Sequence, residues 1–295
     1  MDIKVGSAPD NWGVWFPQDP KQTPWVRFMD EIVEAEYEWT ELGPYGYLPT
    51  DMDQLRDEIN KRGLKVSGTV VMGDLTDPSG WLNVEQQLMG AGPILAELGA
   101  PYIVLIDGLY TDVFTNESLR PAELNNDQWK HMIDASHRVA TIARDKFALK
   151  VVFHPHAETH VETEEQIEQF LDDTDPGLLP ICLDTGHHEY RGGDAVQFLA
   201  DHQDRIEYLH LKSVDGELRD RVNREKIPFG KAVEMDLFCE LAKGTVDFAA
   251  LAELLKKIDF DGFAIVEQDM FPCPFDKPLP IAKRNRQYLR EAGIG

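Results

Sequence analysis

The feature that most constrains the fold is an alternation of short apolar segments with longer amphipathic ones along the chain. Residues 64–72 (LKVSGTVVM) and 101–107 (PYIVLID) have the composition of buried strands. Residues 51–63 and 247–258 space their apolar side chains along one face of a helix. About eight such β/α units follow one another, which predicts an α/β fold: a single (β/α)8 TIM barrel spanning residues 1–295, with its active site at the carboxyl ends of the strands.

Each predicted strand is short and apolar. The eight are residues 3–10, 37–43, 64–72, 101–107, 149–155, 180–184, 206–212 and 263–269. A doubly wound sheet is the structural alternative, but it would be expected to show a glycine-rich phosphate turn after an early strand. Here the first strand runs into SAPDNWGVWFP, which contains no G-x-G-x-x-G, so the barrel is favoured. The longer inserts, Tyr110 to Asn126 and Val214 to Gly244, follow strands, where active-site loops of barrels belong.

The charge of the chain narrows the classes of partner. Its 53 acidic and 29 basic residues give a net charge of −24, which argues against nucleic acid and anionic membranes as partners. Three cysteines without CxxC spacing indicate neither a disulfide framework nor a zinc ribbon. The N-terminal segment lacks an apolar signal region and no apolar run approaches 18 residues, so we expect a cytoplasmic protein that acts on a small molecule.

Ligand-type side chains stand at the ends of four consecutive predicted strands. Those ends carry His154 and His156, Asp184 and His187, His210 and Lys212, and Glu267. Carboxylates and imidazoles that converge at a barrel mouth form a mixed N/O set, which suits Mn²⁺, Co²⁺, Zn²⁺ or Mg²⁺. Without a cation such a cluster would be costly, because its like charges repel one another in a desolvated place.

Each of these residues also has a structural explanation. Asp184 before Thr-Gly reads as an Asx turn that caps the next helix. A single histidine after a strand is more often a hydrogen-bonded structural residue, and Glu267 could be the first exposed residue after its strand. Four consecutive strands that all end in this way favour a metal site over independent structural explanations.

The segments HPHAETHVET, CLDTGHHEY, YLHLKSVD and IVEQD resemble the xylose-isomerase-like barrel superfamily of sugar isomerases, epimerases and dehydratases. The segments APDNWGVWFP and ELGPYGYLP are most similar to its inosose dehydratase branch. The resemblance implies that Asp184, His210 and Glu267 hold a divalent metal, with Mn²⁺ expected first. Many relatives have Glu-x-His where this chain has His154-Pro155-His156. The fourth ligand is therefore His154, which we favour, or a nearby acid, Glu158 or Glu162.

The resemblance also implies a reaction. A divalent ion beside imidazoles suits proton abstraction α to a ketone, with a metal-held enediolate. Expulsion of a β-substituent would make the enzyme a lyase that acts on a keto-inositol such as inosose or on a related 3-keto-sugar. Reprotonation would make it a sugar isomerase or epimerase, which is the alternative. His156 and His187 are the candidate base and acid, Glu162 is in reserve, and Lys212 could hold a substrate or enolate oxygen.

Residues from the first half of the chain are expected to shape the substrate pocket. The candidates for contact with a cyclic polyol are Trp12, Trp15, Glu41, Tyr45 and Asp107, together with Glu158 from the second half. An abasic-site nuclease is a rival on the same scaffold, and the net charge of −24 argues against it. The superfamily resemblance makes a homo-oligomer, a dimer or tetramer, reasonable.

Overall fold

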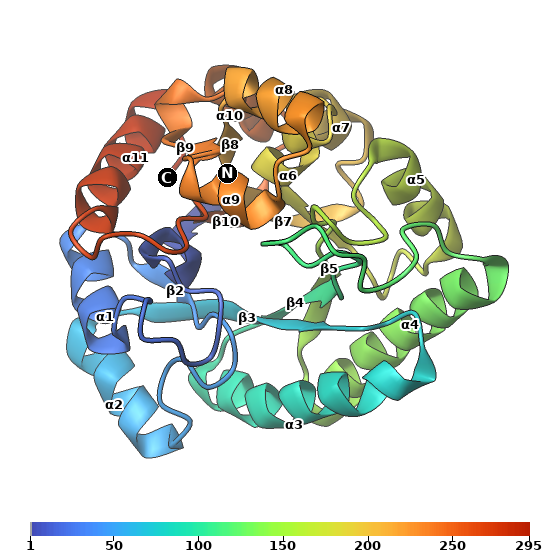
Figure 1. Cartoon of the computed structure of the whole chain (residues 1–295). Coiled ribbons are helices and arrows are strands. Elements are labelled where there is room, and N and C mark those ends of the chain that lie inside the picture. The colour runs from blue at the N-terminus through green and yellow to red at the C-terminus, as the bar shows by residue number, and fades with distance from the viewer. Residues whose placement is uncertain (1) are drawn as a thin grey trace.

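The computed structural model describes residues 2–295, and Met1 lies outside the described residues. Eight parallel strands close into a barrel in the order β1-β10-β7-β6-β5-β4-β3-β2, and helices surround it (Figure 1). The strands are β1 (Asp2–Ser7), β2 (Trp39–Glu41), β3 (Lys65–Gly73), β4 (Tyr102–Asp107), β5 (Lys150–Phe153), β6 (Ile181–Asp184), β7 (Ile206–Leu211) and β10 (Asp261–Val266). Each predicted strand overlaps one of them, so the predicted α/β barrel is confirmed.

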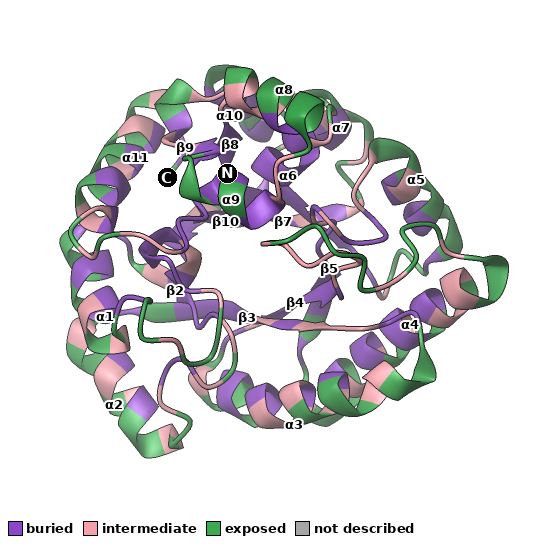
Figure 2. Cartoon of the chain, in the orientation of Figure 1, coloured by how far each residue is buried: buried purple, intermediate pink, exposed green. Residues whose placement is uncertain are grey.

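Helices cover the outside of the barrel, and their exposed residues lie on the sides that face away from it (Figure 2). They are α1 (Trp25–Glu34), α2 (Met52–Arg62), α3 (Trp81–Leu98), α4 (Asn126–Phe147), α5 (Glu164–Asp173), α6 (Thr185–Tyr190), α7 (Ala195–Asp201), α8 (Gly216–Glu225), α9 (Phe229–Glu234), α10 (Phe248–Lys257) and α11 (Pro278–Ala292). Within residues 2–295, none of the helices combines the length and the apolar character needed to cross a membrane.

The insert after β7 has secondary structure of its own. Strands β8 (Ser213–Val214) and β9 (Phe238–Cys239) pair antiparallel, and α8 and α9 lie between them in the chain. In Figure 1 this insert lies over the β7 and β10 side of the barrel. Because the insert packs on the barrel and every described strand belongs to one of these two units, we infer a single domain.

Local sequence signals set the helix ends. Asp51 accepts a hydrogen bond from the backbone N–H of Gln54 at 2.9 Å and so caps α2, which ends at Gly63 with a φ of 66°. At α4, the side chain of Asn125 accepts from the backbone N–H of Gln128, whose own side chain accepts from the N–H of Asn125. Such caps fix where each strand-to-helix loop ends.

Alternation along the strands decides which side chains face the barrel interior. Tyr102, Tyr208 and Phe263 belong to one buried cluster inside the barrel, and their rings contact one another. Successive residues of a strand point to opposite faces, so Cys182 and Asp184 on β6 share the inner side. The lower interior is therefore packed, and the inward polar side chains lie at the carboxyl ends of the strands.

The strand register places these ends side by side. Asp184 on β6 lies directly opposite His210 on β7. The backbone N–H of Glu267 donates to Leu211 O at 3.1 Å, and that of His154 donates to Leu105 O at 2.8 Å, so both residues extend their strands. The four predicted ligands consequently emerge around one mouth.

Candidate active site and metal centre

The structure brings the four predicted metal ligands together. One potential ligand atom from each of His154, Asp184, His210 and Glu267 lies within 4.8 Å of those from the other three. His210 Nδ1 is 3.2 Å from Glu267 Oε2 and 3.7 Å from Asp184 Oδ2, and His154 Nε2 is 3.6 Å from Asp184 Oδ2. All four residues are buried. Neither Glu158 nor Glu162, the alternative fourth ligands, belongs to this group.

The second nitrogen of His210 is held by a carboxylate. Its Nε2–H donates to Glu41 Oε1 at 2.9 Å, and the hydroxyl of Tyr208 donates to the same oxygen at 2.8 Å. A carboxylate behind a histidine fixes the tautomer and leaves the other ring nitrogen free to bind a metal. Glu41, which was predicted to accept a substrate hydroxyl, also lines a cavity beside the ligands, and in addition it orients His210.

Lys212 lies on the floor of the site among three carboxylates. Its Nζ is 3.0 Å from Asp184 Oδ2, 3.0 Å from Glu267 Oε2 and 2.9 Å from Asp269 Oδ2. Burial alone would lower the pKa of Lys212, but these negative charges outweigh it and hold the pKa well above its usual value. Lys212 is therefore a buried ammonium group rather than a surface lysine.

The first three residues of the DTGH segment each have a separate structural role. Asp184 caps α6, because its Oδ1 accepts from the backbone N–H of His187 at 2.8 Å. The hydroxyl of Thr185 donates to Lys212 O at 2.6 Å, which ties α6 to β7. A Cβ at Gly186 would lie 2.5 Å from Lys212 Cγ, so a glycine is needed where the lysine passes.

The donor set fits a divalent cation. Asp184 Oδ2 and His210 Nδ1 are buried within the cluster and make no well-aligned hydrogen bond, although each has an oppositely charged neighbour, Lys212 or Glu267. Two imidazoles and two carboxylates suit Mn²⁺, Co²⁺ or Zn²⁺. Burial opposes the ionisation of Asp184, but the charge of Lys212 and the neighbouring imidazoles outweigh it and hold the pKa of Asp184 well below its usual value. The carboxylate is thus ready to bind a metal.

A sulfur ligand also lies within reach, which sequence reasoning missed. Cys182 forms a second possible group with His154 and His210, the same two histidines. Burial raises the pKa of the Cys182 thiol to about 12, which disfavours the thiolate that a soft metal prefers. The N/O set therefore remains the better description of this centre.

His156 and His187 differ in access to the cavity beside the ligands. This inner cavity, of about 60 Å³, is lined by all the ligands except Asp184 and also by His156 and Lys212. His156 Nδ1 is 2.7 Å from Ala157 O, and because a carbonyl can only accept, Nδ1 carries the proton and Nε2 the lone pair. His187 is not among the lining residues, and its Nε2 is 3.1 Å from Lys212 Nζ.

Two acidic residues of the cavity received no role in the sequence analysis. Asp10 and Asp269 line the inner cavity, and Asp269 is two residues beyond Glu267 on the same inward side. Burial and the negative charges of Glu267 and Asp269 raise the pKa of Asp10 well above its usual value, which favours the protonated carboxyl group. The strand period could have identified Asp269, whereas Asp10 lies in a short 3-10 helix (Pro9–Trp12) after β1, where that period does not apply.

Asp107, which was predicted to contact substrate, does not line the inner cavity. Along β4, Val104 and Ile106 face the barrel interior, so Asp107 points to the outer side. Its Oδ2 is 2.6 Å from His160 Nδ1, and its Oδ1 accepts from the backbone N–H of Leu75 at 3.0 Å. Both oxygens are therefore used in linking loops.

The catalytic role predicted for Glu162 and the substrate role predicted for Glu158 are also not supported. Both carboxylates pair with Arg191, and Glu162 additionally accepts from the hydroxyl of Tyr110 at 2.6 Å. Neither acid lines the inner cavity or the wider one above it. The opposite charge of Arg191 holds them beside the insert after β4.

Of the predicted aromatic contacts, only Trp15 lines a cavity next to the ligands. Trp15 lies in the wall of the wider cavity, and its Nε1–H donates to Asp269 Oδ1 at 3.0 Å. Trp12 is a core residue instead, fully buried with its Nε1–H bonded to Glu31. Tyr45 is 37 % exposed, and the structure brings neither Trp12 nor Tyr45 to the cavities beside the ligands.

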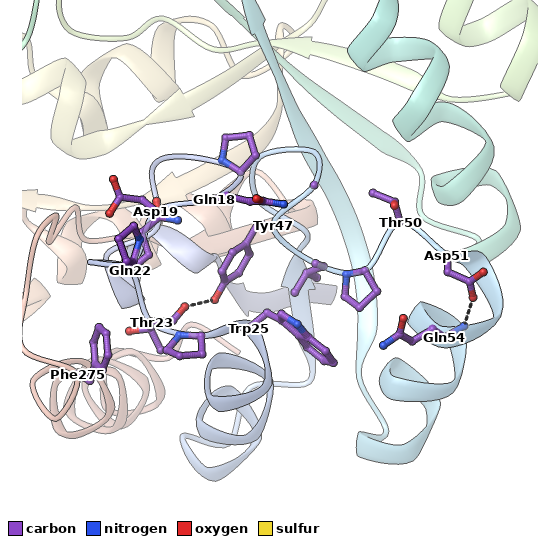
Figure 3. Close-up of a pocket in the computed structure, with 16 residues that line it drawn as sticks. Gln18, Asp19, Gln22, Thr23, Trp25, Tyr47, Thr50, Asp51, Gln54 and Phe275 are labelled. Carbon is purple, nitrogen blue, oxygen red and sulfur yellow. Dashed lines mark hydrogen bonds between the residues drawn. The ribbon is translucent and has the colours of Figure 1, made fainter.

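A separate open hollow of about 970 Å³ lies away from this chemistry. Figure 3 shows it between the loop that contains Gln18 and Thr23 and the segment from Tyr47 to Gln54, with Phe275 at one side. The Tyr47 hydroxyl bonds to Thr23 O across it at 2.9 Å. None of the metal-ligand candidates lines this hollow, so its size does not mark the active site.

The closed barrel and the four-residue cluster define a class: (β/α)8 proteins with a buried set of N and O donors at the strand ends that could hold a metal ion. A family model described as "Xylose isomerase-like TIM barrel" matches residues 29–292. The chain belongs to this family, as the motif resemblance implied.

Two curated relatives that align over nearly the whole chain are both named inosose dehydratase. The inosose dehydratase of Geobacillus kaustophilus is 28% identical over 97% of this chain and 94% of its own length. The inosose dehydratase of Clostridium botulinum is 27% identical over 98% of this chain and 97% of its own. The predicted similarity to the inosose dehydratase branch is confirmed.

Solved structures show the same fold at lower identity. A probable 3-DHS dehydratase from Bacillus anthracis has a TM-score of 0.73 at 14% identity, covering 97% of this chain and 98% of its own. A 3-keto-D-glucoside 4-epimerase from E. coli has a TM-score of 0.71 at 18% identity, covering 98% and 100%. The IOLI protein, solved with a zinc atom, has a TM-score of 0.69 at 16% identity, covering 99% and 96%.

Proposed function

We propose that this protein is a divalent-metal-dependent carbon–oxygen lyase that eliminates a β-substituent from a keto-polyol such as inosose or a related 3-keto-sugar. The observation that carries the proposal is the buried cluster of His154, Asp184, His210 and Glu267, which adjoins a cavity lined by His156 and Lys212. The inosose dehydratase relatives, which align over nearly the whole chain, support this reaction over others of the same fold.

His154, Asp184, His210 and Glu267 would hold the ion. A divalent ion at this place supplies a Lewis acid that polarises a substrate carbonyl and acidifies the neighbouring C–H bond. Mn²⁺ remains the metal we expect first, with Zn²⁺, Co²⁺ and Mg²⁺ as alternatives. The buried floor excludes water, which strengthens every electrostatic interaction with a bound substrate.

His156 is the proposed base. Burial lowers the pKa of His156 to about 3, so the ring is neutral at pH 7 and its Nε2 lone pair is available to the cavity. Because His187 Nε2 faces Lys212, we assign it to positioning that ammonium group rather than to proton transfer. The ammonium of Lys212 would donate to the substrate oxygen on which negative charge develops.

Asp10 is the proposed acid. Its raised pKa favours the protonated carboxyl group, which lines the same cavity and can protonate the leaving oxygen as the C–O bond breaks. Replacement by Asn should lower kcat about 100-fold or more and leave the metal content unchanged. A variant Asp10→Asn with wild-type kcat would remove Asp10 from this role.

The deciding experiment is a product assay on inosose and 3-keto-glucose in deuterated water, with the purified protein supplied with Mn²⁺ or treated with chelator. We expect loss of water from the substrate, seen by mass spectrometry, and loss of turnover with chelator. Products that have lost no water but have gained deuterium would instead identify the isomerase or epimerase alternative. Turnover that chelator leaves unchanged would contradict the metal-dependent reaction.

A further inference from the structure

A second, wider cavity of about 230 Å³ lies beside the inner one. The two spaces adjoin, because the same five residues line both: Asp10, Val70, Ile106, His156 and Asp269. The wall of the outer cavity comes from the loops after β1 and β4, from β3 and from α9 in the insert after β7. A substrate bound at the metal cluster would therefore extend into the outer cavity.

This outer wall is mostly apolar. Among its side chains are Val14, Phe16, Met72, Leu109, Val113 and Phe229. The polar groups within it are already engaged. The amide of Gln87 bonds to the backbone N–H and C=O of Met72 at 3.2 and 2.8 Å, and the Trp15 Nε1–H donates to Asp269.

The polar atoms of the outer cavity thus lie on its floor. Asp10, His156 and Asp269 are its only acidic or imidazole residues, and all three also line the inner cavity. A sugar ring on this floor finds hydrogen-bond partners, whereas hydroxyls that point outward would lose water without replacement. Each such hydroxyl weakens binding roughly tenfold. A ring with hydroxyls on every side is a poor fit to this polarity gradient.

We propose that the substrate is a keto-sugar glycoside whose leaving group is an apolar, ring-containing alcohol or phenol held in the outer cavity. This proposal rests on the lyase function proposed above and specifies its substrate class. The aromatic wall supports it, since the rings of Trp15, Phe16 and Phe229 all line the outer cavity.

The elimination balances without a redox partner. In a 3-keto-glucoside the acidic hydrogen is on C2 and the aglycone oxygen on C1. His156 takes the C2 proton, and the electrons of that bond form the C1–C2 double bond. The C1–O bond breaks, its electron pair stays on the aglycone oxygen, and that oxygen leaves as a neutral alcohol with a proton from Asp10. The sugar product is an unsaturated ketone.

The proposal is tested by kcat/KM for four keto substrates: methyl 3-keto-glucoside, 4-nitrophenyl 3-keto-glucoside, 3-keto-glucose and inosose. The Mn²⁺-loaded enzyme is expected to favour the 4-nitrophenyl substrate about tenfold or more over each of the others. Equal values for the methyl and 4-nitrophenyl glucosides, or higher values for either free keto-compound, overturn the proposal. Elimination from none of the four overturns the lyase function itself.

A binding measurement tests whether the outer cavity holds an aglycone, independently of any catalytic turnover. Calorimetry on chelator-treated protein uses methyl and 4-nitrophenyl glucoside, which lack the ketone and cannot react. We expect about tenfold tighter binding of the 4-nitrophenyl glucoside whether or not the protein turns over keto-sugars. Equal affinities for the two overturn the aglycone site.

Two matched variants of the insert after β4 locate the effect. Val113 lines the outer cavity, whereas Leu119 in the same insert is 58 % exposed and lines neither cavity. Val113→Ser should reduce the preference for the 4-nitrophenyl group about fivefold, and Leu119→Ser should leave it unchanged. The same loss in both variants, or in neither, overturns the assignment of the aglycone to this wall.

Discussion

At the scale of single residues, Asp184 shows how one carboxylate serves two purposes. Its Oδ1 caps α6 through the backbone N–H of His187, and its Oδ2 lies buried in the ligand cluster. The helix-cap and metal-ligand interpretations of DTGH were alternatives in the sequence, yet the two oxygens allow both. Substitutions at this residue can therefore separate capping from metal binding.

The first prediction uses Asn and Ala at Asp184. Asn keeps an oxygen for the cap but removes the charge, so Asp184→Asn should lose the metal and keep the cap. Ala removes both, and Asp184→Ala should be less stable than Asp184→Asn by about 1 kcal/mol. Elemental analysis measures the metal content of each variant, and urea unfolding measures its free energy of unfolding. Wild-type metal content in either variant would contradict the ligand assignment.

Glu41 provides a second prediction, about positioning. Glu41→Gln should weaken metal affinity about 10- to 100-fold, because the orientation and basicity of His210 depend on the carboxylate. Tyr208→Phe is the matched control, since it removes the other hydrogen bond to Glu41 and leaves the bond to His210. Competition with a metal-binding dye measures both affinities. An equal loss in the two variants would mean that general packing is responsible.

At the scale of elements, a buried histidine ties the loops after β4 and β5 together. His160 Nδ1 is 2.6 Å from Asp107 Oδ2 at the end of β4, and Nε2 is 3.0 Å from Pro121 O. Both neighbours accept, so both ring nitrogens donate and the ring is charged. Burial alone would lower the pKa of His160, but the hydrogen bond and charge of Asp107 outweigh it and raise the pKa.

The upward shift in the pKa of His160 determines how its contribution to stability changes with pH. Because the pKa of His160 is higher in the folded state than its ordinary value of about 6.5, its contribution is complete below pH 6.5. It is lost as the pH rises through the folded-state pKa. His160→Gln should cost about 1.5–3 kcal/mol at pH 6 and less at alkaline pH, measured by urea unfolding.

His131→Gln is the control for this third prediction, because His131 is only partly buried and lies on the outer helix α4. Its free energy of unfolding should follow the wild-type pH profile. A His160→Gln variant with the same deficit at every pH would show that lost packing, rather than the charged imidazole, accounts for the change.

At the scale of the whole molecule, the ligand cluster couples metal binding to folding. The cluster draws its residues from the ends of four neighbouring strands, β5, β6, β7 and β10, so it exists only once these strands have paired. A cation that binds the folded state alone stabilises it by about 2.7 kcal/mol at a free concentration 100 times its Kd.

The fourth prediction is therefore a rise in Tm of a few °C on addition of Mn²⁺, reversed by chelator and measured by scanning calorimetry. Glu267→Gln should abolish the rise because it removes one anionic ligand. The same rise in Glu267→Gln and wild type would show that Mn²⁺ acts on the acidic surface, whose net charge is −24, and not at the cluster.

The sequence by itself determined the barrel, because the period of two in strands and of 3.6 in helices is written in local side-chain order. It also identified His154, Asp184, His210 and Glu267, since each follows an apolar run at a strand end. No distant contact is needed to recognise such patterns.

Only the tertiary structure decided which nearby polar residues share the cavity. Asp107 turns outward, Glu158 and Glu162 pair with Arg191, and Trp12 packs into the core. Asp10 and Asp269 enter the cavity instead. These outcomes depend on whether a side chain at the end of a strand points into or out of the barrel, and on partners tens of residues away in the sequence. The local sequence around a residue does not specify these partners, because only the folding of the barrel brings them together.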